Sequence, residues 1–192
     1  MYKRQNNGSV SLPPAESAQP RQDRVFDDVD EGHWAFRYIK DLKVRGVISG
    51  DGVYYYPEAP VTREEFVKML LGAFAVEPGG GEAFADVEPD AWYAAYVAKA
   101  KELGIVIGIS EEQFGTGKSI TREDIAVLCS RMLAYTGGTL KKVQMPAAFT
   151  DAQDISDYAR PAVEAMQQAG IINGYEAVSY THLRAHETLR HL

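Results

Sequence analysis

The chain has 192 residues, of which 45% are hydrophobic and 24% charged, and its net charge is -7. This composition suits a soluble globular chain of one compact domain or several small units. The excess of acids excludes a broad electrostatic attraction to nucleic acid or to an anionic lipid surface, so any anionic partner must be held by local positive charges.

The first 24 residues are rich in Ser, Pro, Gln and Asn and contain almost no large apolar side chains. They predict a flexible linker, and an ordinary disordered terminus is an equally good interpretation. They also lack the apolar stretch of a signal peptide, and no later run of 18 apolar residues could cross a membrane. We therefore expect no membrane insertion, and if the protein is exported, its leader is absent from this sequence.

After the linker, one pattern occurs three times. Each copy opens with Phe-x-Asp, at Phe26, Phe84 and Phe149. Trp34 and Trp92 follow the first two phenylalanines at the same distance, and aligned apolar residues and glycines come after them. Such extended agreement predicts a tandem array of similar structural units. We assign residues 25–77 and 83–136 to two complete repeats, 137–147 to a linker and 148–176 to a partial third repeat.

Each repeat is expected to contribute two helices joined by a turn. In the second copy, apolar side chains at three- and four-residue steps indicate one buried helical face, and Gly104 supplies the C-terminal stop. A second helix is predicted to start at Thr62 and at Thr121, which take the N-cap positions. Glu65 completes a capping box behind Thr62, and Asp124 is a shorter version of it.

The segment "FGTGKSITRED" at 114–124 contains a Gly-Lys-Ser that is typical of the end of a nucleotide-binding loop. The full loop needs a glycine at the position of Glu112, where a carboxylate would repel phosphate, and a buried strand before it, where the sequence is polar and acidic. The segment corresponds to "YYPEAPVTREE" in the first copy, and no phosphate chemistry is preserved between the two. We therefore reject a nucleotide site.

Phe-x-Asp-Val, the following Trp, Gly-Val-Ile-x-Gly and Val-Thr-Arg-Glu-Glu together resemble the S-layer homology family. The resemblance covers about residues 25–176. It implies a mainly helical, pseudo-threefold assembly of three units, here with the third unit incomplete. It also implies a non-catalytic module that anchors an exported bacterial protein at the cell wall or S-layer, outside the cell. The implied partner is a peptidoglycan-linked secondary cell-wall polysaccharide, which in many members carries a pyruvate ketal.

The family's motif arginine maps onto Arg63 and Arg122. A physical argument supports these residues, because the first position of a helix disfavours a cation unless something else requires it there. A guanidinium beside free backbone N–H groups makes a site for a carboxylate. The alternative is that each arginine only pairs with Glu64, Glu123 or a loop acid.

Aromatic residues are the other candidates for sugar contacts. Tyr55 and Tyr56, in a loop just before a helix start, suit the wall of an amphipathic groove. Trp34 and Trp92 could stack on a sugar, but a tryptophan in a helical apolar stripe is more often part of the core, which we favour for both. The full set of predicted ligand-binding residues is Arg63, Arg122, Thr62, Thr121, Glu64, Glu123, Tyr55 and Tyr56, with Trp34 and Trp92 as stacking candidates.

The sequence "EAVSYTHLRAHETLRHL" breaks the pattern, because the third Thr-Arg-x-Glu helix start is missing. Its histidines do not follow the metalloprotease order His-Glu-x-x-His, and we predict neither a metal nor a cofactor. The string resembles translated sequencing-adaptor read-through, so we treat 177–192 as non-native. Without the second helix of the third repeat, we expect apolar surface to be uncovered and the chain to be marginally stable.

No nucleophile motif, Cys-His pair or ordered metal set is visible, so the sequence does not predict an enzyme. Two alternatives to wall anchoring stay open. One is a structural or protein-binding scaffold of a surface layer, which would use the same helical surfaces. The other, which we favour less, is part of a wall-polysaccharide hydrolase, whose two carboxylates the sequence cannot exclude. The oligomeric state is not decided by the sequence.

Overall fold

The computed structural model describes residues 25–146, 149 and 152–173. Its helices are α1 (Phe36–Val44), α2 (Arg63–Ala73), α3 (Ala94–Glu102), α4 (Arg122–Tyr135) and α5 (Arg160–Gln168), with a 3₁₀ turn, η1, at Ala152–Asp154. The predicted linker 1–24 and tail 177–192 lie outside the described residues. So do 147–148 and the last residues of the predicted third unit. Within the described residues there are isolated bridges but no strands, so the prediction of a mainly helical fold is confirmed.

The first helices of the repeats, α1, α3 and α5, end in the same way. Each is followed by a glycine in the left-handed conformation, with φ of +71° at Gly46, +68° at Gly104 and +72° at Gly170. A glycine adopts this conformation without the steric cost that other residues have, so it closes the helix. The predicted stop at Gly104 is thus confirmed.

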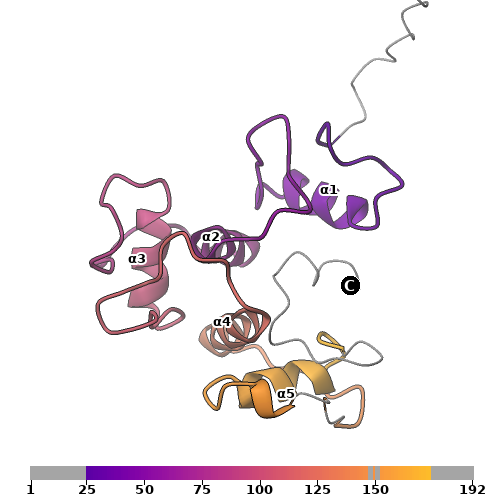
Figure 1. Ribbon diagram of the computed structural model, residues 1–192, viewed down its shortest axis with the longest axis vertical. Helices are drawn as coiled ribbons and strands as arrows, with labels where there is room; N and C mark the ends of the chain where they lie inside the picture. The colour runs from indigo at the N-terminus through magenta and orange to yellow at the C-terminus, as the bar shows by residue number, and fades with distance from the viewer. Residues whose placement is uncertain (1–24, 147–148, 150–151, 174–192) are drawn as a thin grey trace, which may run out of the picture.

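The second helices, α2 and α4, lie at the centre of the molecule (Figure 1). They pack against each other, while α2 also packs against α3 and α4 against α5. Each second helix therefore pairs with the first helix of the following repeat. The structural pairs are offset from the sequence repeats, and every boundary between repeats is a packed interface.

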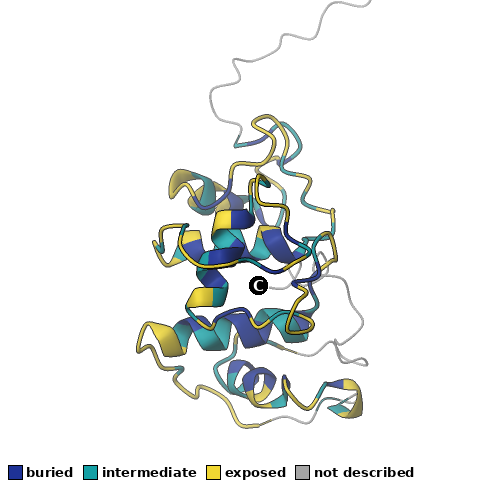
Figure 2. Cartoon of the chain, turned by 90° about the vertical axis from the view of Figure 1, so that its left-hand side faces the viewer, coloured by how far each residue is buried: buried dark blue, intermediate teal, exposed yellow. Residues whose placement is uncertain are grey.

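Three apolar clusters hold this arrangement. The largest joins α2, α3 and α4, and includes Val67, Val97 and Met132. A second lies between α4 and α5, and a third lies around α1, with partly buried side chains of α2 packed against it. Figure 2 shows the buried residues of the helices turned toward one another and the connecting loops mostly exposed. Because α2 and α4 each contribute to two of these clusters, these two helices link the clusters to one another.

The short segments after α1 and α3, "GVISG" and "GIVIG", turn sharply. Gly50 has φ of +55°, and a Cβ there would meet the carbonyl oxygen of Tyr54 at 2.2 Å. Gly108 has φ of +88°, and its Cβ would meet the carbonyl oxygen of Gln113 at 2.5 Å. Only glycine allows the backbone to approach so closely at these two positions.

Candidate functional site

The loop that leads into each second helix is held by the aspartate near the start of the same repeat. The Asp28 carboxylate accepts hydrogen bonds from the backbone N–H groups of Tyr55 (2.9 Å) and Tyr56 (2.6 Å). Asp86 accepts equivalent bonds from the backbone of residues 114–116, at 2.7, 2.8 and 3.2 Å. Burial acts to raise the pKa of Asp86, but the three N–H donors outweigh it, so this pKa lies below its ordinary value.

These contacts show which residues of the two loops correspond to each other. Tyr55 and Phe114 take the same position, and the ring of each lies against the opening phenylalanine of its own repeat, with centroids 5.4 and 5.9 Å apart. Tyr56 and Gly115 take the next position, and both have a positive φ, of +60° and +88°. At these two positions the backbone is therefore alike in both repeats, whereas the side chains differ.

The helix starts have the caps that the sequence predicts, with one difference. The Thr62 side chain accepts a hydrogen bond from the Glu65 backbone, and the Glu65 carboxylate accepts one from the Thr62 N–H at 2.8 Å, which completes the capping box. Thr121 caps α4 by accepting from the Asp124 N–H at 3.2 Å. The Asp124 carboxylate is expected from the sequence to accept a hydrogen bond from the Thr121 N–H in return. This is wrong, because the carboxylate binds side chains of the other repeats.

Arg63, at the first position of α2, is buried, with 6% of its surface exposed. Its Nε donates to the Phe114 carbonyl oxygen at 3.0 Å, and its Nη1 donates to the Asp124 carboxylate at 2.6 Å. The guanidinium carbon also lies 5.3 Å from the centroid of the Phe114 ring. Arg63 thus binds the loop and helix of the second repeat. Arg122, at the same position of α4, is likewise buried, with 8% exposed.

The glutamates that follow the arginines also reach into the next repeat. Both carboxylate oxygens of Glu64 lie 3.2 Å from the backbone N–H donor of Gly117. Glu123 accepts from the backbone N–H of Ser156 at 3.0 Å and from its hydroxyl at 3.1 Å. Arg63, Glu64 and Glu123 therefore connect successive repeats to one another.

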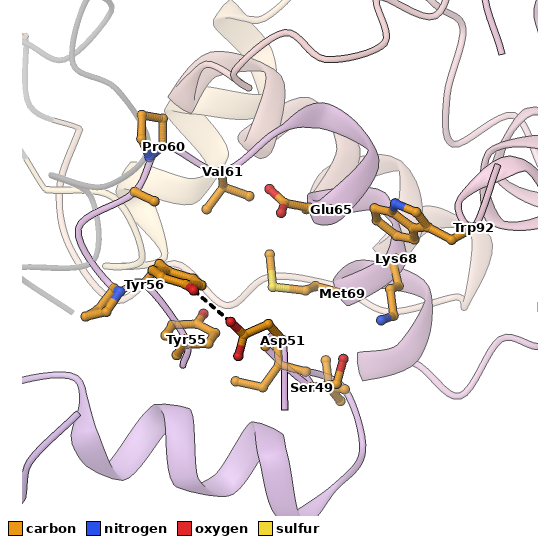
Figure 3. Close-up of a pocket in the computed structure, with 15 residues that line it drawn as sticks. Ser49, Asp51, Tyr55, Tyr56, Pro60, Val61, Glu65, Lys68, Met69 and Trp92 are labelled. Atoms are coloured by element: carbon orange, nitrogen blue, oxygen red, sulfur yellow. Dashed lines mark hydrogen bonds between the residues drawn. The ribbon is translucent and has the colours of Figure 1, made fainter. Parts of the chain in front are cut away.

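A pocket of about 530 Å³ opens between the first and second repeats (Figure 3). Its walls come from the "GVISG" turn, the loop before α2 and the outer side of α2, and Trp92 of the second repeat closes one end. The lining residues with polar or aromatic side chains are Ser49, Asp51, Tyr55, Tyr56, Glu65, Lys68 and Trp92. Residues of two repeats therefore line the pocket.

Lys68 is the one cation among the residues that line this pocket. Its Nζ lies 5.5 Å from the centroid of the Trp92 ring, within the range of a cation–π contact. Two carboxylates, Asp51 and Glu65, line the same pocket, and Glu65 is held by the capping box of α2. The pocket thus offers one positive charge beside an aromatic face, and hydrogen-bond acceptors elsewhere.

Asp51 caps a turn, as an Asp-Gly sequence predicts, and it also binds a side chain. Its Oδ1 accepts from the backbone N–H groups of Tyr54 (2.6 Å) and Val53 (2.9 Å), and its Oδ2 accepts from the Tyr56 hydroxyl at 2.7 Å. The pKa of Asp51 is lowered, first by the hydrogen bond from the Tyr54 N–H and next by the one from the Tyr56 hydroxyl. The same bond to Asp51 raises the pKa of Tyr56.

The structure brings three of the predicted residues together in the pocket: Tyr55, Tyr56 and Trp92. The other predicted residues lie outside its lining: Arg63, Arg122, Thr62, Thr121, Glu64, Glu123 and Trp34. Trp34 packs against the apolar cluster around α1, as favoured above. The same preference is wrong for Trp92, which is 55% exposed.

Neither Lys68 nor Asp51 is among the ligand-binding residues predicted from the sequence. A signal for Lys68 was nonetheless present, because α2 and α4 begin with the same motif and Val127 stands on α4 where Lys68 stands on α2. A charge that only one of two similar helices carries indicates a local requirement. The position of Trp92 across the pocket depends on how the repeats pack, which the pattern alone does not specify.

Among the described residues, no group of three or more His, Cys, Asp or Glu side chains is arranged to hold a metal ion. No helix in that part of the chain is both long and apolar enough to span a membrane.

Several known proteins are similar to this chain. An endoglucanase of Bacillus sp. (strain KSM-635) is 32% identical over 141 residues, which cover 72% of this chain and 15% of the endoglucanase. An amylopullulanase of Thermoanaerobacterium thermosulfurigenes is 34% identical over 157 residues, or 79% of this chain and 8% of that protein. The surface-layer 125 kDa protein of Lysinibacillus sphaericus is 30% identical over 152 residues, or 78% of this chain and 12% of that protein. The chain thus spans only a small part of each relative.

The model of the S-layer homology domain matches residues 25–67, 83–126 and 148–180. These are the three repeats, and the third match runs past residue 176, where we placed the end of the third unit. S-layer homology domains are non-catalytic modules that anchor proteins to the cell wall, and the proteins that carry them are found at the cell surface. The repeats, their capped helix starts and this match show that the chain belongs to the S-layer homology domain family.

Proposed function

We propose that this chain anchors its parent protein to the bacterial wall by binding a peptidoglycan-linked polysaccharide in the pocket between the first and second repeats. One observation carries the proposal. Lys68 and the exposed ring of Trp92 lie together at one end of a pocket whose opposite wall contains Tyr55 and Tyr56. An aromatic face beside a cation suits a sugar ring that bears a negative charge.

The ligand in this proposal is an anionic saccharide, such as one that carries a pyruvate ketal. Its carboxylate would lie against the Lys68 ammonium, and its apolar ring face would lie against Trp92. Both carboxylates of the lining already accept local hydrogen bonds. Asp51 accepts from the Tyr56 hydroxyl and from the backbone of its own turn, and Glu65 accepts from the Thr62 N–H. Such bonds to donors spread the negative charge and reduce repulsion of an anion.

For Arg63 we propose a positioning role in place of direct contact with the ligand. Its guanidinium is engaged by the Phe114 carbonyl and the Asp124 carboxylate, and its burial leaves little surface for a saccharide. By fixing the second repeat against α2, it would keep Trp92 opposite Lys68. For Arg122, a role as carboxylate ligand stays a prediction from the repeated motif.

Binding to purified wall sacculi tests the function. The chain should sediment with sacculi that retain their polysaccharide and should stay in solution with sacculi that have been chemically stripped of it. Equal binding to both would contradict the proposal. A scaffold function without saccharide binding would give no sedimentation with either.

Lys68→Ala tests the placement of the charge. A hydrogen bond to a charged group contributes about 1.5 kcal/mol, so we expect about tenfold weaker binding to sacculi at low salt. The difference should shrink as salt rises, because exposed charges are screened. Lys118→Ala is a matched control, since Lys118 is exposed on the loop before α4 and does not line the pocket. Equal losses in both variants would remove the basis for this site.

A further inference from the structure

We infer that the hydrogen-bonded pair of Tyr56 and Asp51 determines the specificity of the pocket by reading the hydroxyl groups of the bound sugar. The inference rests on the proposed function and adds a second, uncharged recognition element to it. Figure 3 shows the pair bridging the loop before α2 and the turn at Asp51, with Tyr56 on the side of the pocket away from Trp92 and Asp51 between them.

The first observation is the backbone of Tyr56. Its φ is +60°, a left-handed conformation that is unfavourable for a bulky side chain. The second repeat has Gly115 at the same place in the loop, with φ of +88°. Glycine adopts this conformation without steric cost, so the fold of the loop does not require tyrosine. Tyr56 thus stands at a position where the backbone conformation favours glycine.

Packing does not account for the tyrosine. Its side chain is 55% exposed, and its ring neighbour is Tyr54, which is also exposed, at a centroid distance of 5.9 Å. The backbone N–H of Tyr56 bonds to Asp28, but the Gly115 N–H makes the same bond to Asp86, so this contact needs no side chain. What the side chain adds is a hydroxyl and a ring edge on the wall of the pocket.

The chemistry of the pair suits hydroxyl groups. The Oδ1 of Asp51 is taken by two backbone N–H groups, which fix the carboxylate in place, and its Oδ2 accepts the Tyr56 hydroxyl. One lone pair of Oδ2 and those of the tyrosine oxygen are left to accept hydrogen bonds. Neighbouring sugar hydroxyls can donate to such a pair of acceptors, whereas a sugar carboxylate cannot. The pair would thus bind the uncharged side of the saccharide, and Lys68 its carboxylate.

The second repeat lacks this element. Gly115 stands in place of Tyr56, and Ser110 lies four residues before Phe114 as Asp51 lies four residues before Tyr55. The Ser110 hydroxyl accepts the Gln113 N–H at 3.1 Å, as Asp51 accepts the Tyr54 N–H, but it carries no charge and has no tyrosine hydroxyl to pair with. We therefore expect saccharide specificity to come from the first of these two repeats.

Tyr56→Gly and Tyr56→Phe, compared with Ala75→Gly, test the inference in binding to polysaccharide-bearing sacculi and in thermal unfolding. Ala75 is a second non-glycine residue with positive φ, of +53°, and it lies outside the pocket lining. Ala75→Gly should raise the unfolding midpoint and leave binding unchanged. Tyr56→Gly should not lower the midpoint, yet it should weaken binding at least fivefold. Tyr56→Phe, which keeps the ring, should weaken binding by a factor that does not change with salt, unlike that of Lys68→Ala.

The outcomes separate the two proposals. If the wild-type chain does not bind intact sacculi, the proposed function fails. If it binds, and Tyr56→Phe binds equally well, the inference is wrong and the proposed function stands. A lower midpoint for Tyr56→Gly together with normal binding by Tyr56→Phe would show that the tyrosine is structural, and would also overturn the inference.

Discussion

At the scale of single residues, the aspartates of the first two Phe-x-Asp motifs have a defined structural task. Asp28 and Asp86 hold the loop before the second helix through backbone N–H groups, at positions where the sequence shows only a repeated acid. A carboxylate with several such donors is stabilised in its charged form. Asp28 thus fixes the loop that carries Tyr55 and Tyr56, and Asp86 fixes the equivalent loop at residues 114–116.

Asp86→Asn tests this task through pH. Because the folded-state pKa of Asp86 is lowered below its ordinary value of 3.8, the charged carboxylate stabilises the fold above that pH, and this contribution is lost as pH falls toward the folded-state pKa. We expect Asp86→Asn to lower the free energy of unfolding by about 1.5 kcal/mol at pH 7. The difference from wild type should shrink below about pH 4, in denaturant unfolding measured across pH.

Asp90→Asn is the control for this prediction, since Asp90 is exposed in the same segment. It should change stability little at any pH, as surface substitutions usually do. A difference between Asp86→Asn and wild type that stays constant from pH 7 down to pH 3 would contradict the assigned role.

At the scale of elements, the helix starts of α2 and α4 join the repeats. Arg63 reaches from the first repeat to Asp124 of the second, and the other oxygen of Asp124 accepts the Tyr158 hydroxyl of the third at 2.9 Å. The pKa of Tyr158 is raised, mainly by burial and next by the charge of Asp124. The hydroxyl is therefore protonated at neutral pH and can donate. One chain of contacts thus runs through all three repeats.

Removal of one member of this chain should be costly. Arg63→Ala leaves Asp124 without its cation in a largely buried place, and breaking such a pair lowers the free energy of unfolding by about 3 kcal/mol. Asp41→Ala, which removes only an exposed pair of α1 with Arg45, should lower it by less than about 0.5 kcal/mol. Denaturant unfolding of both variants checks this, and similar losses would show that the inter-repeat pair contributes no more than a surface pair.

The elements themselves were largely predictable from the sequence. Periodic apolar residues, the threonine caps and Gly104 are local signals, and local signals fix where helices begin and end. Packing is not a local property. The pairing of α2 with α3, the turn of Asp124 away from its own cap and the exposure of Trp92 all depend on contacts between repeats, so the sequence pattern could not show them.

At the scale of the whole molecule, each second helix packs on the first helix of the following repeat. This offset between sequence repeat and structural pair explains where the candidate site lies. Because α2 packs on the helix of the next repeat, a residue near the start of that repeat, Trp92, faces the loop of the previous one. The candidate site is therefore composed of two repeats. Tyr55 and Tyr56 could be predicted from their place in a loop before a helix, whereas Lys68 acquires its role only through this packing.

The two tryptophans allow the most direct test of the central claim, that the pocket between the first two repeats binds wall saccharide. The chain contains only Trp34 and Trp92, so a two-dimensional NMR spectrum should show two indole N–H signals, assigned with Trp34→Phe and Trp92→Phe. When solubilised wall polysaccharide is titrated in, we predict that the Trp92 signal shifts in a saturable manner and the Trp34 signal does not. Saturable binding that leaves the Trp92 signal unchanged would contradict the claim.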